Sequence, residues 1–138
     1  MKKITILLLI ASAFSCKNTQ GVVAKDNSDP TKYINTITAA DLKKHLYIVA
    51  SDEMEGRETG SKGQKKAGLY LIDQYKKDKV TFPKGAKDYY RHIPASYLNA
   101  KRNQNLPDSE NIWAYIEGTD KPDEIVVLSA HYDHVGMK

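Results

Sequence analysis

A chain of 138 residues has room for one modest domain. Its composition, 41% hydrophobic and 28% charged, is ordinary for a globular protein and lacks the excess of Gly and Pro found in low-complexity chains. The formal charge is +4, but removing Lys2 and Lys3, the only charges of the first fifteen residues, leaves +2. The remaining basic residues are interleaved with acidic ones, which argues against a nucleic-acid-binding surface.

Residues 1–15 have the parts of a secretory signal peptide. Lys2 and Lys3 supply a positive start, Ile4 to Ile10 form an apolar core, and residues 11–13 are the small residues of a cleavage site. The apolar run is shorter than the roughly 20 residues that span a bilayer, and no later segment is apolar enough to do so. The sequence therefore predicts an exported protein.

Cys16 is the only cysteine and comes directly after that apolar core. Because a lone cysteine forms no intramolecular disulfide, another role is needed, and its position resembles the acylated cysteine of a bacterial lipoprotein. Two neighbours depart from the lipoprotein pattern: Ala13 replaces the usual Leu, and Phe14 is bulky. We expect lipid attachment at Cys16 and anchoring in the bacterial cell envelope. The alternative is cleavage after Ala13, which leaves a free thiol on a periplasmic or secreted protein.

A polar segment, residues 16–33, predicts a flexible tether, and residues 34–138 carry the signals of a folded domain. Thr38 and Asp41 form a capping box, which marks the start of a helix. The apolar residues that follow share one helical face at i, i+4 and i+7: Leu42, Leu46 and Val49.

A polar loop with three glycines, residues 51–63, follows this helix. Its order Gly60-Ser61-Lys62-Gly63 fails the pattern of a phosphate-binding loop, so nucleotide binding is not supported. Ser61 and Gln64 instead form a second capping box, which opens a helix from Lys62 to Lys77. One face of this helix is suited to packing on a sheet: Ala67, Gly68, Leu71, Ile72 and Tyr75.

Strands are expected in the rest of the chain. Residues 89–98 predict a strand that Pro94 limits to an edge or a bend. Residues 111–117 alternate as a strand, and a turn at residues 118–122 leads into the strand Glu124 to Ala130.

The run from Ile125 to Leu128 is apolar on both faces, as suits a central strand covered by helices. The predicted fold class is therefore α/β: the amino-terminal part of a mixed, mostly parallel sheet flanked by helices, whose edge begins as a hairpin. Without further strands, this run would be an exposed edge prone to association.

His131, Asp133 and His134 come just past the end of that strand, where ligands gather in open α/β sheets. In an extended segment, residues i and i+2 face the same side, so His131 and Asp133 can address one site. An imidazole held by a carboxylate through its second nitrogen is typical of a zinc ligand. A catalytic zinc needs three protein ligands, however, so a loop histidine bonded to an aspartate explains this cluster better when it is taken alone.

Three segments taken together resemble one family. Residues 50–67 resemble the amino-terminal signature of secreted co-catalytic di-zinc aminopeptidases, and residues 109–118 and 125–136 resemble that family's next two landmarks, in order. The family includes bacterial leucyl-type aminopeptidases, with glutaminyl cyclases as relatives. The resemblance covers about residue 38 to the end of the chain.

The resemblance implies an exported zinc-dependent metallo-aminopeptidase that removes amino-terminal residues from peptides, with two zinc ions in the complete site. His131 matches the first zinc ligand, and Asp133 matches the catalytic-site carboxylate that orients it; His134 is not expected to be a ligand. We expect the other ligands and the general-base glutamate beyond Lys138, so that these 138 residues alone would be inactive. A structural loop of the family matches Gly56, Arg57 and Gly60.

Two other functions stay open. A glutaminyl cyclase could use the same scaffold, and the residues that distinguish it would lie beyond Lys138. A non-catalytic envelope lipoprotein could have kept the scaffold and lost the metal; it would lack the later carboxylate pair and the final histidine.

Substitution of Cys16 by Ser is expected to release the protein from membrane fractions, because the lipid is attached through the cysteine sulfur. Cell fractionation followed by immunoblotting of the processed protein measures this partitioning. A Cys16→Ser protein that stays with the membrane as the wild type does would contradict the lipoprotein assignment.

Overall fold

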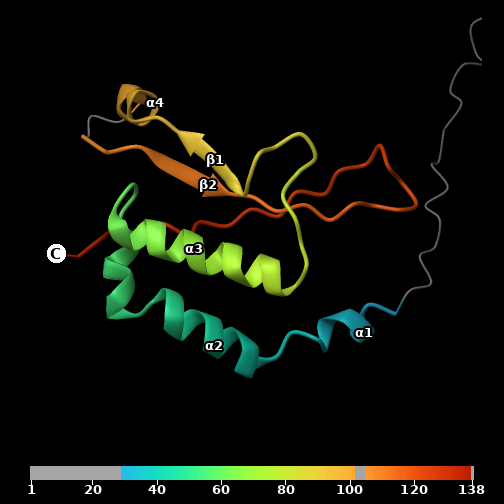
Figure 1. The fold of residues 1–138 in the computed structure, drawn as a ribbon. Helices are drawn as coiled ribbons and strands as arrows, with labels where there is room; N and C mark the ends of the chain where they lie inside the picture. Colours follow the sequence, from blue (N-terminus) through green and yellow to red (C-terminus); the bar gives the residue numbers. More distant parts are fainter. Residues whose placement is uncertain (1–28, 102–104, 138) are drawn as a thin grey trace, which may run out of the picture. The chain divides into compact units, whose positions relative to one another are not determined.

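The computed structural model describes residues 29–101 and 105–137 of the chain (Figure 1). The predicted signal peptide, Cys16 and most of the predicted tether lie outside these described residues. Contacts separate the chain into two units at the boundary between Thr36 and Ile37.

The described part of the first unit contains α1 (Thr31–Ile34), a single helical turn at the end of the predicted tether. The Asp29 carboxylate accepts hydrogen bonds from the backbone N–H and the hydroxyl of Thr31, at 3.0 and 2.6 Å. Of the helices in the described part of the chain, none has the length and apolar character needed to cross a bilayer.

The second unit begins with α2 (Ala39–Val49), which starts where the capping box predicts. The Thr38 hydroxyl accepts a hydrogen bond from the Asp41 backbone N–H at 3.1 Å and donates one to the Asp41 carboxylate. Within the described residues, two members of its apolar stripe are exposed, Leu42 at 53% and Leu46 at 58%, whereas Val49 is half-buried. The helix is therefore confirmed, and most of its apolar face is open.

A short 3-10 helix, η1 (Asp52–Arg57), leads into α3 (Lys62–Lys77), which has the predicted bounds. The Ser61 hydroxyl caps α3 by accepting from the Gln64 backbone N–H at 3.2 Å. The Gln64 side chain is buried, and its oxygen accepts a hydrogen bond from the Ser109 hydroxyl at 2.8 Å. The buried face of α3 comprises Gly63, Gln64, Ala67, Gly68 and Ile72.

The sheet consists of β1 (Tyr90–Ile93) and β2 (Ser109–Ile112), paired antiparallel so that the first residue of each strand lies opposite the last residue of the other. In Figure 1, α3 lies beneath this pair, and it contacts β2 directly. The β2 strand begins and ends earlier than the predicted strand of residues 111–117.

The predicted strand of residues 89–98 is wrong beyond Ile93, because α4 (Ala95–Lys101) follows immediately. Pro94 precedes the helix, where its fixed φ suits helix initiation and its missing N–H costs nothing. The Pro94 carbonyl accepts from the N–H of Tyr97 at 3.0 Å. The Asp108 carboxylate caps the new helix by accepting from the Ala95 N–H at 2.7 Å.

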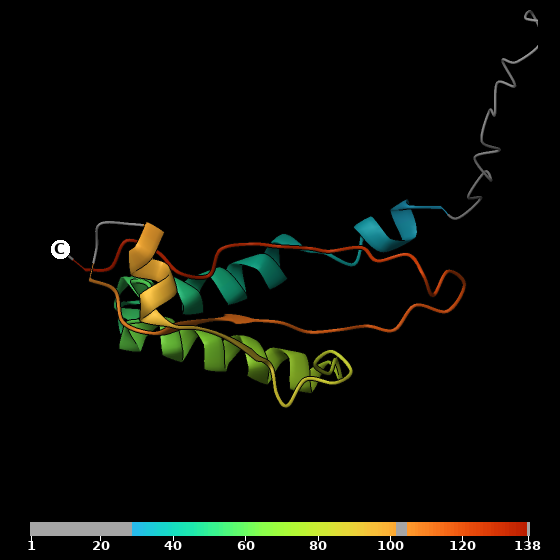
Figure 2. The same cartoon turned by 90° about the horizontal axis from the view of Figure 1, so that it is seen from above.

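At a coarse level the fold mixes helices with a small sheet, as expected, but the described residues contain no parallel sheet. The described residues show neither the predicted strand of residues 124–130 nor its hairpin with residues 111–117, and β2 pairs with β1 instead. The segment after β2 runs away from the sheet, turns near Lys121 and returns (Figure 2). A strand needs a neighbour for its backbone N–H and C=O groups, and no described residue supplies one to residues 125–130.

The core of the described residues is small, and one part of it is an aromatic cluster around Tyr89. The Tyr89 ring stacks on Tyr75, meets Phe82 edge-on at a centroid distance of 5.2 Å, and donates its hydroxyl to the Val80 carbonyl at 2.7 Å. By contrast, residues 125–128 are between 78% and 94% exposed. The buried apolar side chains are Met54, Ala67, Ile72 and Tyr89.

Candidate functional site

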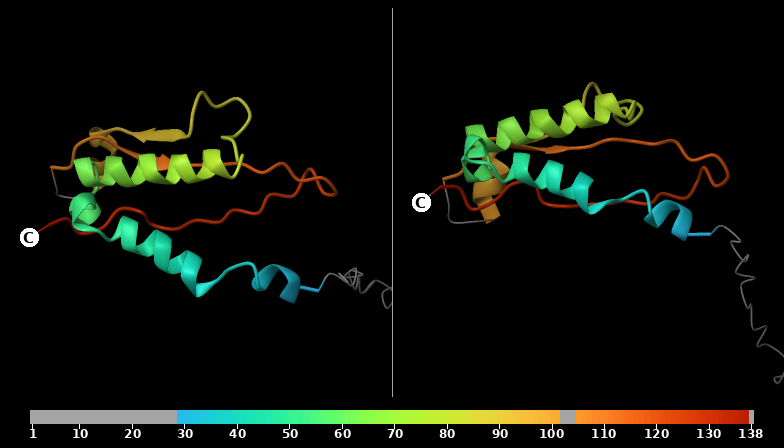
Figure 3. Two further views of the ribbon diagram at one scale, coloured as in Figure 1. Left: turned by 60° about the horizontal axis from the view of Figure 1, so that its bottom comes forward. Right: turned by 90° about the horizontal axis from the view of Figure 1, so that it is seen from below.

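Two segments that are far apart in the sequence meet at an isolated parallel bridge between Glu58 and His134. The His134 N–H donates to the Arg57 carbonyl at 2.8 Å, and the Gly136 N–H donates to the Gly56 carbonyl at 3.0 Å. Figure 3 shows the red carboxyl-terminal segment passing the loop between η1 and α3. We call residues 56–60 and 131–136 together the loop clamp. It joins two of the segments that carry the family resemblance.

The loop side of the clamp has an unusual backbone. Glu55, Gly56, Arg57 and Gly60 all have positive φ, at 51°, 64°, 50° and 79°. For residues with a side chain this region costs roughly 1–2 kcal/mol each, so the conformation persists only where other contacts hold it. The hydrogen bonds to residues 132–136 provide those contacts.

Arg57 holds the backbone on both sides of Asp133. Its carbonyl accepts from the His134 N–H, and its Nε donates to the Tyr132 carbonyl at 2.8 Å. Both contacts are made to backbone atoms, so Arg57 sets where the Asp133 main chain lies. The structural role expected for this arginine agrees with these contacts.

Asp133 receives a hydrogen bond on each carboxylate oxygen. The Thr59 hydroxyl donates to Oδ2 at 2.7 Å, and Nδ1 of His131 lies 3.1 Å from Oδ1. Burial acts to raise the pKa of the Asp133 carboxyl, but the hydrogen bonds from Thr59 and His131 outweigh it, so the pKa lies below the ordinary aspartate value. The carboxylate is therefore ionised at neutral pH.

An ionised carboxylate only accepts hydrogen bonds, so the proton between Asp133 and His131 belongs to Nδ1 of the imidazole. In the neutral ring, Nε2 then carries the free lone pair that a metal ion needs. The His131 side chain is 92% exposed, whereas the Asp133 side chain is only 28% exposed. The pair thus combines a fixed carboxylate with an accessible imidazole.

Tyr132 anchors the same segment to the sheet and to α3. Its hydroxyl donates to the Glu110 carbonyl of β2 at 2.7 Å, and its ring approaches Gly68 of α3. Burial raises the pKa of the Tyr132 phenol, with smaller contributions from the negative charges of Glu110 and Asp133. The phenol therefore stays neutral where an ordinary tyrosine begins to ionise.

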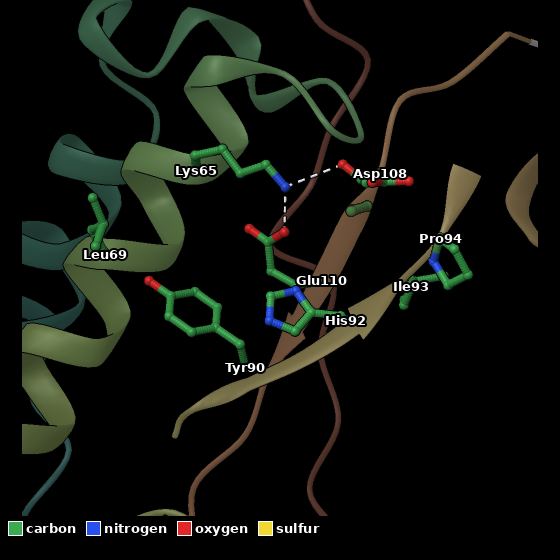
Figure 4. A pocket seen from close by; sticks show the side chains of 9 residues that line it. Lys65, Leu69, Tyr90, His92, Ile93, Pro94, Asp108 and Glu110 are labelled. Atoms are coloured by element: carbon green, nitrogen blue, oxygen red, sulfur yellow. Dashed lines mark hydrogen bonds and ion pairs between the residues drawn. The ribbon is translucent and has the colours of Figure 1, made fainter. Parts of the chain in front are cut away.

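A hollow of about 450 Å³ lies between α3 and the β1–β2 pair (Figure 4). In Figure 4, Lys65 points to the buried carboxylate of Glu110, and it also donates to the Asp108 carbonyl at 3.2 Å. Lys65 and Glu110 thus pair with each other, and the carboxylate of Asp108, which also lines the hollow, accepts from the Ala95 N–H. His92 is another lining residue, and these contacts give no specific indication of a ligand.

A second hollow of about 920 Å³ lies beside the His131–Asp133 pair. It is bordered by apolar side chains of α3 and β2, such as Leu71 and Ile112, and by Val127 and Leu128 of the returning segment. Exposed apolar groups gathered on two sides of an open volume are typical of an interaction or ligand-binding surface.

The described residues offer one position for zinc, not a full set. No three His, Cys, Asp or Glu side chains converge in the described part of the chain, and Cys16 lies outside it. His131 with its orienting carboxylate fits a single ligand position. His134 enters the clamp through its backbone N–H.

The sequence does not predict the contact of Thr59 with Asp133 or that of Tyr132 with Glu110. Both contacts join residues more than twenty positions apart, so no local periodicity shows them.

Comparison with family models, with curated proteins and with solved structures finds no match in any of the three.

The Gly56→Ala substitution is expected to open the loop clamp. A Cβ at Gly56 would lie 2.4 Å from the Gly136 carbonyl oxygen, and the residue has a φ of +64°. The strain and the clash together should cost about 3 kcal/mol. Hydrogen exchange of the His134 and Gly136 amides measures the loss of protection.

The matched control is Gly85→Ala, because Gly85 has a φ of +84° with no atom within 4 Å of an added Cβ. That substitution carries the backbone strain alone, about 1 kcal/mol. Equal protection of the two amides in the Gly56 and Gly85 variants would contradict the tight approach in the clamp.

The raised pKa of Tyr132 predicts an alkaline loss of stability. The folded chain holds the phenol proton more tightly than the unfolded chain, so the stabilising contribution is complete below about pH 10 and is lost as the pH rises toward the folded pKa. The Tyr132→Phe variant should therefore show a shallower fall in the free energy of unfolding above that pH. Urea titrations at several pH values measure it, with exposed Tyr47→Phe as control; equal slopes in the wild type and Tyr132→Phe would refute the prediction.

Proposed function

We propose that this chain contributes the amino-terminal part of an exported zinc-dependent aminopeptidase, in which His131 is a zinc ligand and Asp133 orients it. One observation carries the proposal: Nδ1 of His131 lies 3.1 Å from an Asp133 oxygen, on a ring that is 92% exposed. Nδ1 is therefore occupied, and Nε2 is accessible from solvent. This is the arrangement in which a histidine binds zinc through one nitrogen and a carboxylate holds the other.

The clamp supports the proposal because it makes the pair rigid without using the imidazole. Arg57 and Gly56 bind the backbone of residues 132–136, and Tyr132 is tied to β2. A metal ligand benefits from such support, since a site held only loosely loses affinity. When bound, zinc would supply Lewis-acid polarisation of the scissile peptide carbonyl.

The same proposal includes a mostly parallel sheet that is larger than the β1–β2 pair. Residues 125–128 are apolar on both faces and largely exposed, and the hollow of about 920 Å³ opens between them and the β1–β2 layer. These features favour a larger, mostly parallel sheet in which residues 124–130 are a central strand covered by helices. The motif resemblance implies further zinc ligands and a general-base glutamate in addition to His131 and Asp133.

The His131→Ala substitution tests the function directly in the complete gene product. Loss of a ligand removes several kcal/mol of carbonyl polarisation, so hydrolysis of an aminoacyl p-nitroanilide should fall at least about 100-fold, and bound zinc should decrease. Zinc content is measured by elemental analysis of the purified protein.

The matched control is His92→Ala, which removes an exposed histidine on β1 outside the clamp. It should leave the rate of hydrolysis and the zinc content unchanged. Full activity and full zinc content in the His131→Ala protein would defeat the ligand assignment. Parallel assays of amino-terminal glutamine cyclisation separate the peptidase from a cyclase. Absence of both activities in the wild type favours a non-catalytic lipoprotein.

A further inference from the structure

We propose that Thr59 is a positioning residue of this site: its hydroxyl fixes one oxygen of Asp133, so that the other oxygen selects the Nδ1–H form of His131. The consequence for zinc rests on the proposed function, while the positioning itself is a property of this chain. The chain of hydrogen bonds runs from Thr59, in the loop after η1, through the Asp133 carboxylate to the exposed His131 ring.

The Asp133 carboxylate needs two contacts to be held in one orientation. The last torsion of an aspartate is broad and roughly two-fold, so a carboxylate with one contact turns easily. Thr59 occupies Oδ2 at 2.7 Å, and Oδ1 then faces Nδ1 of His131 at 3.1 Å. The hydroxyl contact therefore decides which oxygen remains for the imidazole and in which direction it points.

The other clamp contacts do not replace Thr59. Arg57 binds the backbone on either side of Asp133, which places the main chain and leaves the carboxylate plane free. Thr59 is half-buried in the loop, and its branched Cβ restricts χ1, so its hydroxyl has few alternative directions. It lies on the same loop as Arg57, so backbone and carboxylate are positioned together.

His131 depends on this link because its ring has little other support. The side chain is 92% exposed, and the hydrogen bond to Asp133 is the contact that the described residues provide. If the carboxylate turns, the ring loses the acceptor that keeps the proton on Nδ1. A solvated histidine ring favours the Nε2–H form, in which the nitrogen needed for a metal is blocked.

The experiment measures the His131 tautomer in the ¹⁵N-labelled complete protein, free of metal, by long-range ¹H–¹⁵N spectra at a pH where histidine is neutral. Wild type should show Nδ1–H. Thr59→Val removes the hydroxyl at nearly constant shape and should give a mixture containing Nε2–H. Thr59→Ser keeps the hydroxyl and should restore most of the Nδ1–H form.

The control is Thr119→Val, which removes another threonine-to-aspartate hydrogen bond, that from Thr119 to Asp120 at 2.9 Å in an exposed turn. It should leave the His131 tautomer at the wild-type value. The backbone amide signals of His134 and Gly136 report whether each variant keeps the clamp, and Thr59→Ser provides the comparison if Thr59→Val loses it.

Zinc itself is the second probe, titrated against a chromophoric chelator. Thr59→Val should weaken zinc binding about tenfold, the lower end of the effect of removing outer contacts of a metal ligand. A wild-type tautomer in Thr59→Val, or an equal change in Thr119→Val, would overturn the positioning role whatever the zinc result. A tautomer change in Thr59→Val, with no zinc bound by the wild type, would support the positioning role and overturn the proposed zinc function.

Discussion

The site depends on the backbone pairing between residues 56–58 and 134–136. These hydrogen bonds hold a loop in which Glu55 and Arg57 have positive φ, a conformation that such residues do not adopt without support. The approach is so close that Gly56 has no room for a side chain. The pairing begins directly after Asp133, and the Arg57 side chain holds the Tyr132 carbonyl directly before it, so together these contacts fix the backbone that carries the His131–Asp133 pair.

The α3 helix connects this clamp to the sheet. Its cap residue Ser61 follows the loop directly, its Gln64 binds the start of β2, and its Gly68 lies against Ile112 of β2 and the Tyr132 ring. Tyr132 in turn reaches the backbone of β2 at Glu110. A single rigid helix thus relates the candidate ligand to the β1–β2 layer, which is how a small core can still position a site.

Residues 125–128 show that a local preference for strand is not enough to form one. Its side chains favour a strand, yet a strand forms only when a neighbour accepts and donates backbone hydrogen bonds. Clamping of residues 132–136 places the run beside an open volume lined by apolar groups. A central strand of a larger sheet, as we propose, would satisfy both the backbone groups and the two apolar faces.

The sequence by itself determined the features that depend on near neighbours: the caps at Thr38 and Ser61, the bounds of α3, and the i, i+2 pairing of His131 with Asp133. These depend on contacts within a few residues and on helical or extended periodicity. Only the tertiary structure decided which strands pair, and only it brought Thr59 to Asp133. Those contacts join residues far apart in the chain, and their partners are chosen by the closure of the whole fold, which no local pattern records.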